Sequence, residues 1–226
     1  MEGLVIVMPT IWIIGDSTVE DNKPPFRGWG WALPEYVKEG VQVKNHGLSG
    51  RSTKSFWDEG LFKPVEEGMQ PGDLLLIQFG HNDEKDDAER HTDPDSTYPE
   101  NLWRYCSIAL EHGTQPVLLT PVARRFFSEP GSLMYTHGEY PQAVRKLAAE
   151  KSIPLCDLKK DSRELYLKLG PEKTAELFVR LAPGENPDFP DGHDDKTHFN
   201  ATGAKVIAGL VAEEMRQIPE LAQFLK

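Results

Sequence analysis

Residues 10–18, TIWIIGDST, join a short apolar run to a polar tip. The run contains three isoleucines, β-branched residues that favour strands, and it therefore predicts a buried β-strand that ends near Gly15. Glycine permits a sharp turn that exposes the side chains after it. Because ligands of open α/β sheets collect at the carboxyl ends of the strands, Ser17 is the candidate nucleophile. The alternative is an ordinary capped turn, for which Asp and Ser are also typical.

Further apolar stretches predict strands at 41–45, 74–79, 115–120 and 153–158. Helical spacing and cap signals predict helices at 29–37, 99–111, 141–151, 162–169, 171–178 and 200–217. Asn200 is the expected N-cap of the last helix and Gly170 the break between the two before it. Loops are expected at 84–96, 124–140 and 183–196, and we expect the second of these to border the active site.

The alternation of strands and helices implies right-handed crossovers and a parallel sheet. The predicted fold is α/β, a three-layer α/β/α sandwich around a flavodoxin-like parallel sheet of about five strands. The length of 226 residues and the lack of an internal repeat favour one domain over residues 1–226.

The composition argues against several classes of partner. A formal net charge of −11 opposes nucleic-acid binding, which needs a basic face. No apolar run approaches the ~20 residues that a membrane span requires. Residues 1–9 contain the acidic Glu2 and only a short apolar run, unlike a signal peptide, so we expect a cytoplasmic location. Cys106 and Cys156 have apolar neighbours and are expected to be buried free thiols.

Residues 195–198, DKTH, supply the groups that a serine nucleophile needs. A serine hydroxyl is a weak nucleophile unless a base lies within hydrogen-bond reach and a third group orients that base. The spacing of three residues can place Asp195 and His198 on one side of a turn before the last helix. Asp195 would then fix the tautomer of His198, whose other ring nitrogen faces Ser17.

Two more polar tips follow predicted strands, GLSG at 47–50 and GHND at 80–83. Neither has the spacing of a phosphate-binding loop, so no nucleotide cofactor is expected. The oxyanion of an acyl-transfer intermediate needs fixed hydrogen-bond donors. The candidates are the backbone N–H groups of Ser17 and Gly50 and the side-chain amide of Asn82.

Two other classes of protein stay open from these residues alone. The histidine and aspartate side chains of segment 193–198 could be metal ligands of a metal-assisted hydrolase, although this leaves the serine and the oxyanion donors unexplained. Trp29, Trp31 and Trp57 could be stacking platforms of a carbohydrate-binding protein without catalysis, although such tryptophans are more often core residues.

Four blocks of the sequence, taken in order, resemble those of the SGNH/GDSL hydrolases. They are GDS at 15–17, Gly50, GHND at 80–83 and DKTH at 195–198. The resemblance spans nearly the whole chain and implies the SGNH hydrolase fold and a serine esterase without cofactor or metal. It implies that the catalytic residues are Ser17, Asp195 and His198 and that the oxyanion donors are Ser17, Gly50 and Asn82.

Within this superfamily, GDST at 15–18, NHGLSGRS at 45–52, FGHND at 79–83 and DKTHF at 195–199 are similar to the rhamnogalacturonan acetylesterase family. This similarity implies removal of acetyl groups from pectin-derived sugars, with acetylxylan or general short-chain esters as the alternative substrates. The expected lack of a signal peptide indicates oligosaccharides taken up by the cell rather than intact polymer. Candidate contacts to a galacturonate carboxylate are Arg51, Arg124 and Arg125. His81 is either a substrate contact or a structural residue, and the sequence leaves the oligomeric state open.

Overall fold

Five parallel strands form the central sheet, in the order β2-β1-β3-β4-β7. The computed structural model describes residues 9–129 and 131–226, so the expectation about a signal peptide lies outside the described residues. The strands are β1 (Thr10–Gly15), β2 (Gln42–Asn45), β3 (Leu74–Gln78), β4 (Gln115–Leu119) and β7 (Leu155–Cys156). Each neighbouring pair is parallel. This flavodoxin-like order confirms the predicted sheet.

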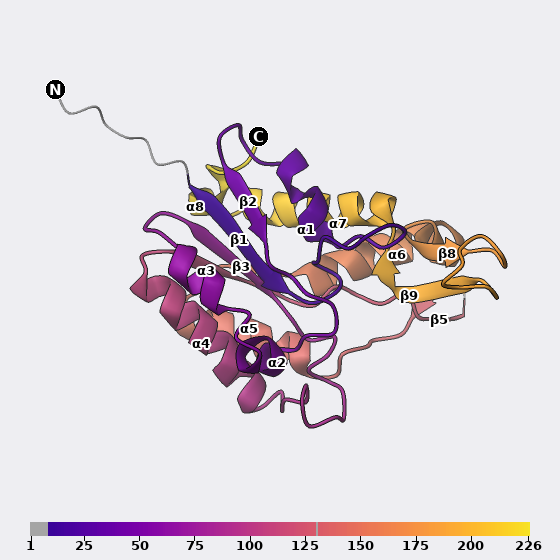
Figure 1. Cartoon of the computed structure of the whole chain (residues 1–226), viewed down its shortest axis with the longest axis horizontal. Helices are drawn as coiled ribbons and strands as arrows, with labels where there is room; N and C mark the ends of the chain where they lie inside the picture. The colour runs from indigo at the N-terminus through magenta and orange to yellow at the C-terminus, as the bar shows by residue number, and fades with distance from the viewer. Residues whose placement is uncertain (1–8, 130) are drawn as a thin grey trace.

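Helices cover both faces of this sheet. They are α1 (Trp29–Ala32), α2 (Thr53–Asp58), α3 (Lys63–Gly68), α4 (Thr97–Glu111), α5 (Tyr140–Lys151), α6 (Leu158–Ala175), α7 (Ala201–Arg216) and α8 (Pro219–Ala222). Ile11 and Ile13 of β1 enter one hydrophobic layer together with α1, α6, α7 and α8. Trp12 and Ile14 enter the other layer with α2, α3, α4 and α5 (Figure 1). The predicted three-layer α/β/α sandwich is confirmed.

Caps and breaks in the sequence set the ends of the last helices. The side chain of Asn200 accepts a hydrogen bond from the backbone N–H three residues on, at 3.0 Å, which confirms it as the N-cap of α7. The predicted break occurs at Gly170, whose φ of 76° is left-handed. The helix nevertheless begins earlier than predicted, at Leu158, because the Asp157 side chain caps it. That cap also ends the strand predicted at 153–158, which spans only Leu155–Cys156.

Other parts of the local structure differ from the predictions. The segment 29–37 is α1 followed by the short 3-10 helix η1 (Leu33–Glu35), because Pro34 has no N–H with which to continue an α-helix. Helices α2 and α3 were not predicted, since six residues are too few to show a clear helical period. Residues 193–196 were expected in a loop and residue 178 in a helix, but both lie in strands. These two strands pair with each other although a loop separates them in the sequence.

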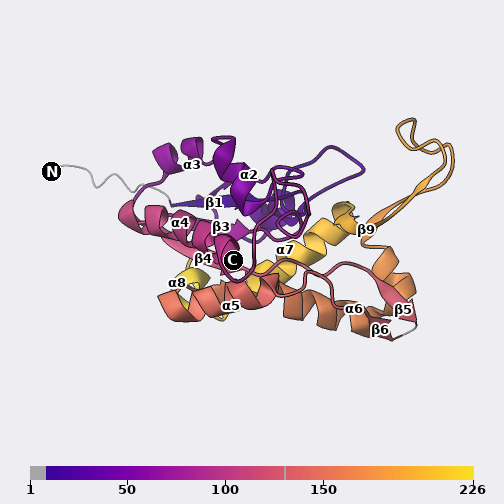
Figure 2. The same cartoon turned by 90° about the horizontal axis from the view of Figure 1, so that it is seen from below.

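These strands, β8 (Phe178–Leu181) and β9 (His193–Phe199), form an antiparallel arm apart from the central sheet. The arm lies beyond the carboxyl ends of β1 and β3 (Figure 1). The loop between its strands, residues 182–192, projects from the body of the molecule (Figure 2). A second small hairpin, β5 (Phe127–Glu129) and β6 (Ser132–Leu133), occupies part of the predicted loop 124–140.

Both cysteines are free and buried, as predicted. Burial raises the pKa of the Cys106 thiol to about 12, so this thiol is not a nucleophile at neutral pH. Within the ranges that the structure describes, every helix is too short or too polar to cross a membrane.

Candidate active site

The turn after β1 presents Ser17 at the carboxyl edge of the sheet, between β1 and β3, where the strand order reverses. Gly15 is required there, because a Cβ atom would lie 2.5 Å from the carbonyl oxygen of Gln78. The carboxylate of Asp16 accepts hydrogen bonds from the backbone N–H and the hydroxyl of Thr18, at 2.9 and 2.8 Å. These contacts fix the turn that carries Ser17.

The structure brings together the three residues that the sequence predicted as a triad. Oγ of Ser17 lies 2.9 Å from Nε2 of His198, and Nδ1 of His198 lies 2.8 Å from Oδ2 of Asp195. In such a line the imidazole can remove the hydroxyl proton, while the carboxylate holds the imidazole in one tautomer.

Asp195 and His198 lie on strand β9 rather than on the predicted turn. Between two regular pairs of the β8–β9 ladder, one residue of β8 faces four residues of β9, 195–198. These residues bulge from the ladder, and Oδ1 of Asp195 accepts hydrogen bonds from the backbone N–H groups of Thr197 and His198 at 2.7 and 2.8 Å. The bulge brings two side chains three residues apart into contact, which the alternation of a regular strand would prevent.

His193 is a second histidine on the same carboxylate. Its Nε2 lies 3.0 Å from Oδ2 of Asp195, the oxygen that also contacts His198. Burial acts to raise the pKa of Asp195, but hydrogen bonds from the ring and backbone of His198 and from the ring of His193 hold this pKa far below its usual value. Asp195 is therefore ionised throughout the neutral range, as the orienting group of a triad must be.

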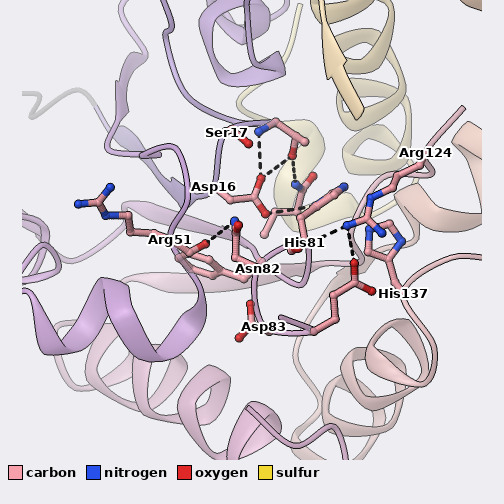
Figure 3. A network of polar contacts seen from close by, with 12 residues as sticks. Asp16, Ser17, Arg51, His81, Asn82, Asp83, Arg124 and His137 are labelled. Atoms are coloured by element: carbon pink, nitrogen blue, oxygen red, sulfur yellow. Dashed lines mark hydrogen bonds and ion pairs between the residues drawn. The ribbon is translucent and has the colours of Figure 1, made fainter. Parts of the chain in front are cut away.

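The oxyanion candidates lie beyond the ends of β2 and β3, next to the turn that carries Ser17. The loop after β2 is tied to β1, since the N–H of Leu48 donates to the carbonyl of Gly15 at 2.9 Å. Gly50 in this loop has a φ of 77°, which glycine adopts without strain. Asn82 is 7% exposed, and its amide donates to the carbonyl of Arg51 at 3.0 Å (Figure 3). This contact holds the amide in place, and its second N–H can serve an oxyanion.

Asp16 and His81 form a buried pair behind the nucleophile turn (Figure 3). Nδ1 of His81 lies 3.2 Å from Oδ2 of Asp16. Burial lowers the pKa of His81. Burial acts to raise the pKa of Asp16, but His81 and the hydrogen bonds from Thr18 lower it below its usual value. The pair is therefore an aspartate that accepts a hydrogen bond from a neutral imidazole.

The far side of His81 is also covered by polar side chains. The ring of His137 packs edge-on against it, with the centroids 4.4 Å apart (Figure 3), and Nζ of Lys159 lies 2.7 Å from Nδ1 of His137. His81 is only 3% exposed. This placement favours a positioning role for His81 over a substrate contact.

Each candidate arginine already has a carboxylate partner. Nη2 of Arg51 lies 2.6 Å from Oε2 of Glu59. Arg124 pairs with Glu84, and Arg125 pairs with Asp194. A galacturonate carboxylate would have to displace one of these partners, so uronate recognition by these arginines stays a prediction.

A pocket of about 320 Å³ opens beside the triad. Its lining residues are Asn22, Phe26, Ser49, Phe189, His193, Asp195 and His198. No sequence pattern predicts a role for Phe26 or Phe189, because aromatic residues in loops have no periodicity, and the sequence predicts His193 only as a possible metal ligand. The available signal for Phe189 and His193 was the position of loop 183–196, which contains Asp195 and ends two residues before His198.

The residues behind the two alternative classes have other contacts. Trp29 is fully buried and its indole N–H donates to the side chain of Gln78 at 2.9 Å, so it is a core residue. Trp57 packs on Phe62, with the ring centroids 6.1 Å apart. His193 and His198 both contact Asp195, and the described residues contain no grouping of three or more His, Cys, Asp and Glu that could hold a metal ion.

The fold is a parallel sheet between two helical layers, and a hydroxyl, an imidazole and a carboxylate lie in line at the carboxyl edge of this sheet. This arrangement is typical of a hydrolase built on an α/β/α sandwich. Residues 13–206 match the sequence model of the GDSL-like lipase/acylhydrolase family. The chain belongs to this family and is a carboxylic ester hydrolase.

Named relatives and solved structures agree with this assignment. The chain is 44% identical to rhamnogalacturonan acetylesterase RhgT of Bacillus subtilis (strain 168), over 92% of this chain and 90% of that protein. It superposes on the crystal structure of Bacillus subtilis YxiM with a TM-score of 0.79 and 27% identity, over 93% of this chain but only 56% of that chain. An acetyl xylan esterase, AlAXEase, shares the fold alone, with a TM-score of 0.64 and 16% identity over 90% of this chain and 98% of that chain.

Proposed function

We propose that this protein is a serine carbohydrate esterase that removes O-acetyl groups from pectin-derived rhamnogalacturonan oligosaccharides. The observation that carries the proposal is the line of Ser17, His198 and Asp195, with contacts of 2.9 and 2.8 Å. The 44% identity to a protein named a rhamnogalacturonan acetylesterase, over 92% of this chain, supports the substrate class. The proposed steps use only side chains, backbone N–H groups and water.

In the first half-reaction, Nε2 of His198 accepts the hydroxyl proton as Oγ of Ser17 attacks the acetyl carbonyl carbon. The backbone N–H groups of Ser17 and Gly50 and the amide of Asn82 are the proposed donors to the resulting oxyanion. The bond between the carbonyl carbon and the sugar oxygen then breaks, and His198 gives its proton to that oxygen. The products are the deacetylated sugar and an acetyl ester on Ser17.

In the second half-reaction, water attacks the acetyl ester while His198 accepts a proton from it. The bond to Oγ of Ser17 breaks, His198 returns the proton to Oγ, and acetate leaves. Asp195 stays ionised in both halves and stabilises the imidazolium. Both half-reactions therefore begin with His198 in its neutral form, as the base.

The test is acetate release by wild type and Ser17→Ala from acetylated rhamnogalacturonan oligosaccharides, acetylated xylan and an aryl acetate. Serine-dependent release that favours the pectin fragments is the expected result. Serine-dependent release from xylan or the aryl acetate alone would contradict the substrate assignment and retain the esterase. Equal release by both variants would contradict the assignment of the nucleophile.

Acetylxylan is the second candidate substrate, because the fold is shared with an acetyl xylan esterase at a TM-score of 0.64. The xylan arm of the experiment decides between the two. A parallel assay with EDTA tests the metal-assisted alternative. We expect full activity in EDTA, whereas loss of activity that returns on adding a divalent metal would support the alternative.

We propose a cytoplasmic location and a role in pectin degradation on oligosaccharides taken up by the cell. Two buried free thiols are typical of a reducing compartment and support the proposal. Fractionation of the source cells tests it, since recovery of the protein outside the cytoplasm would contradict it.

A further inference from the structure

Three aromatic rings line one side of the pocket beside the triad. Phe189 of loop 182–192 lies 4.6 Å from His193 of β9 between ring centroids, with the planes 32° apart. Phe26, from the loop after β1, lies 5.9 Å from Phe189 and 5.8 Å from His198. Phe26, Phe189 and His193, here called the aromatic wall, are half-buried, so each exposes part of its ring to the pocket.

Backbone hydrogen bonds hold the aromatic wall in place. The N–H of Phe189 donates to the carbonyl of Asn186 at 3.0 Å, and the N–H of Gly192 donates to the carbonyl of Phe189 at 2.9 Å. The N–H of Arg27, the residue after Phe26, donates to the carbonyl of Phe199 at the end of β9, at 2.9 Å. The backbone that carries these rings is thus ordered before any ligand arrives, which lowers the entropy cost of binding.

The charge of the pocket argues against an anionic ligand group. None of the described residues that line it is a lysine or an arginine, and one, Asp195, is an ionised carboxylate. A uronate carboxylate in this pocket would face that negative charge without a cationic partner. Asn22 and Ser49 also line the pocket. Nδ2 of Asn22 donates to the carbonyl of Ser17 at 3.1 Å and the Ser49 hydroxyl donates to the carboxylate of Glu20, which leaves the second N–H of Asn22 and a lone pair of the Ser49 oxygen for sugar hydroxyls.

We infer that the aromatic wall is a subsite for a neutral sugar ring next to the ester, with the apolar C–H face of the sugar on Phe189 and its hydroxyls toward Asn22 and Ser49. A flat apolar ring with a few polar groups nearby is the usual way in which a pocket fixes an uncharged ligand. The inference rests on the proposed function and adds which part of the oligosaccharide is recognised. Phe189 is the proposed specificity-determining residue, because its ring is the surface on which the sugar packs. Since it lies outside the triad, its substitution leaves the reacting groups in place.

The first test compares Phe189→Ala, Phe189→Leu and Phe189→Tyr on acetylated rhamnogalacturonan oligosaccharides and on ethyl acetate, which has no sugar. We expect the alanine and leucine variants to raise KM for the oligosaccharide about five- to tenfold, so that the ratio of kcat/KM for the oligosaccharide to that for ethyl acetate falls accordingly. Tyrosine keeps the flat ring and should restore the ratio. Leu110→Ala removes a side chain that is 45% exposed on α4 and should leave the ratio unchanged.

A second test separates neutral-sugar recognition from uronate recognition. The Phe189→Ala effect is measured again with oligosaccharides whose carboxyl groups have been reduced to alcohols. We expect the same loss as with the native oligosaccharides. A loss that disappears on reduction would show that the aromatic wall serves the uronate and would overturn the inference. In the first test, an equal loss of kcat/KM on the oligosaccharide and on ethyl acetate in Phe189→Ala, which leaves their ratio unchanged, would also overturn it.

A binding measurement on variants that lack Ser17 tests the subsite independently of the proposed function. Calorimetry compares the Kd of the oligosaccharide for Ser17→Ala and for Ser17→Ala with Phe189→Ala. A Kd about five- to tenfold weaker in the double variant supports the subsite even if no acetate is released by wild type. Equal Kd values would overturn it, whereas failure of serine-dependent release contradicts only the proposed function.

Discussion

Asp195 shows how much of the site depends on one side chain. Its Oδ1 accepts two backbone N–H groups that shape the bulge of β9, and its Oδ2 contacts both His193 and His198. Every acceptor position of this carboxylate is therefore engaged. A residue in this situation both builds the local backbone and orients the base, and the two roles can be separated by a substitution that keeps its shape.

Asp195→Asn is that substitution. The amide oxygen can still accept the backbone N–H groups, but an N–H₂ in place of Oδ2 would donate to Nδ1 of His198 and place the ring proton on Nε2, facing Ser17. The base is then in the wrong tautomer, and we expect kcat on an aryl acetate to fall on the order of 10⁴-fold, as for this change in Ser-His-Asp triads generally. Urea unfolding should show a stability close to wild type, and a kcat within tenfold of wild type would contradict the assigned role.

His81 allows a similar separation beneath the nucleophile. Asparagine can place an N–H where Nδ1 of His81 meets Asp16, at 3.2 Å in the native pair, whereas glutamine places its amide near the position of Nε2. Oδ2 of Asp16 would lose its donor in the glutamine variant, while Oδ1 keeps those from Thr18, and a buried carboxylate oxygen without a donor is costly. We expect His81→Asn to keep kcat within about threefold and His81→Gln to lower it at least tenfold, with KM similar in both. Equal kcat values for the two variants would show that the contact with Asp16 does not position Ser17.

At the scale of elements, Asn200 joins β9, which carries Asp195 and His198, to the helix after it. Its Oδ1 caps α7, and its Nδ2 donates to the carbonyls of Glu176 and Phe178 at 2.8 and 2.9 Å. We expect Asn200→Ala to lower the free energy of unfolding by roughly 2 kcal/mol, about half from the lost cap. Asn200→Ser keeps a cap but not the amide donors, so urea unfolding should place it between alanine and wild type. A serine variant as unstable as alanine would contradict the contribution of the cap.

The parts of the fold that the sequence predicted are those with strong local signals. The apolar runs of β1, β3 and β4 and the cap at Asn200 are visible in short windows, and so are the glycine tips that gather the site residues. Strand β8 and the bulge of β9 depend on a pairing across loop 182–192, which no local window contains. The motifs at 15–17 and 195–198 predict the proposed triad from short windows, whereas strand β9, which carries Asp195 and His198, and the aromatic wall have no such local signal.

At the scale of the whole molecule, the two hydrophobic layers share one sheet, since alternate residues of β1 enter one layer and then the other. Neither layer can lose its packing without exposing the strands that the other layer covers. We therefore propose that residues 1–226 form a single domain and expect one cooperative thermal transition, with equal calorimetric and van't Hoff enthalpies. Two separate transitions by circular dichroism and tryptophan fluorescence would contradict this proposal.

The stability of the folded protein is expected to depend on pH through the carboxyl group of Asp83. This carboxyl is fully buried, and burial raises its pKa to about 7 against the hydrogen bonds from Thr53 and Thr92, which act to lower it. In the unfolded chain the group titrates near its ordinary value of 3.8. Between these two values the folded state holds a proton that the unfolded state has released, so this group makes stability fall as pH rises toward 7.

Asp83→Asn fixes the neutral form and removes this dependence. Relative to wild type, the asparagine variant should therefore gain roughly 2 kcal/mol in the free energy of urea unfolding between pH 5 and pH 7.5. Asp157→Asn is the matched control. Burial acts to raise the pKa of Asp157, but Arg145 and Thr120 lower it below its usual value, so its carboxylate is ionised in both states across this range. The effect of the control should not vary with pH, and an Asp83→Asn effect that is equally constant would show that Asp83 is ionised in the folded protein.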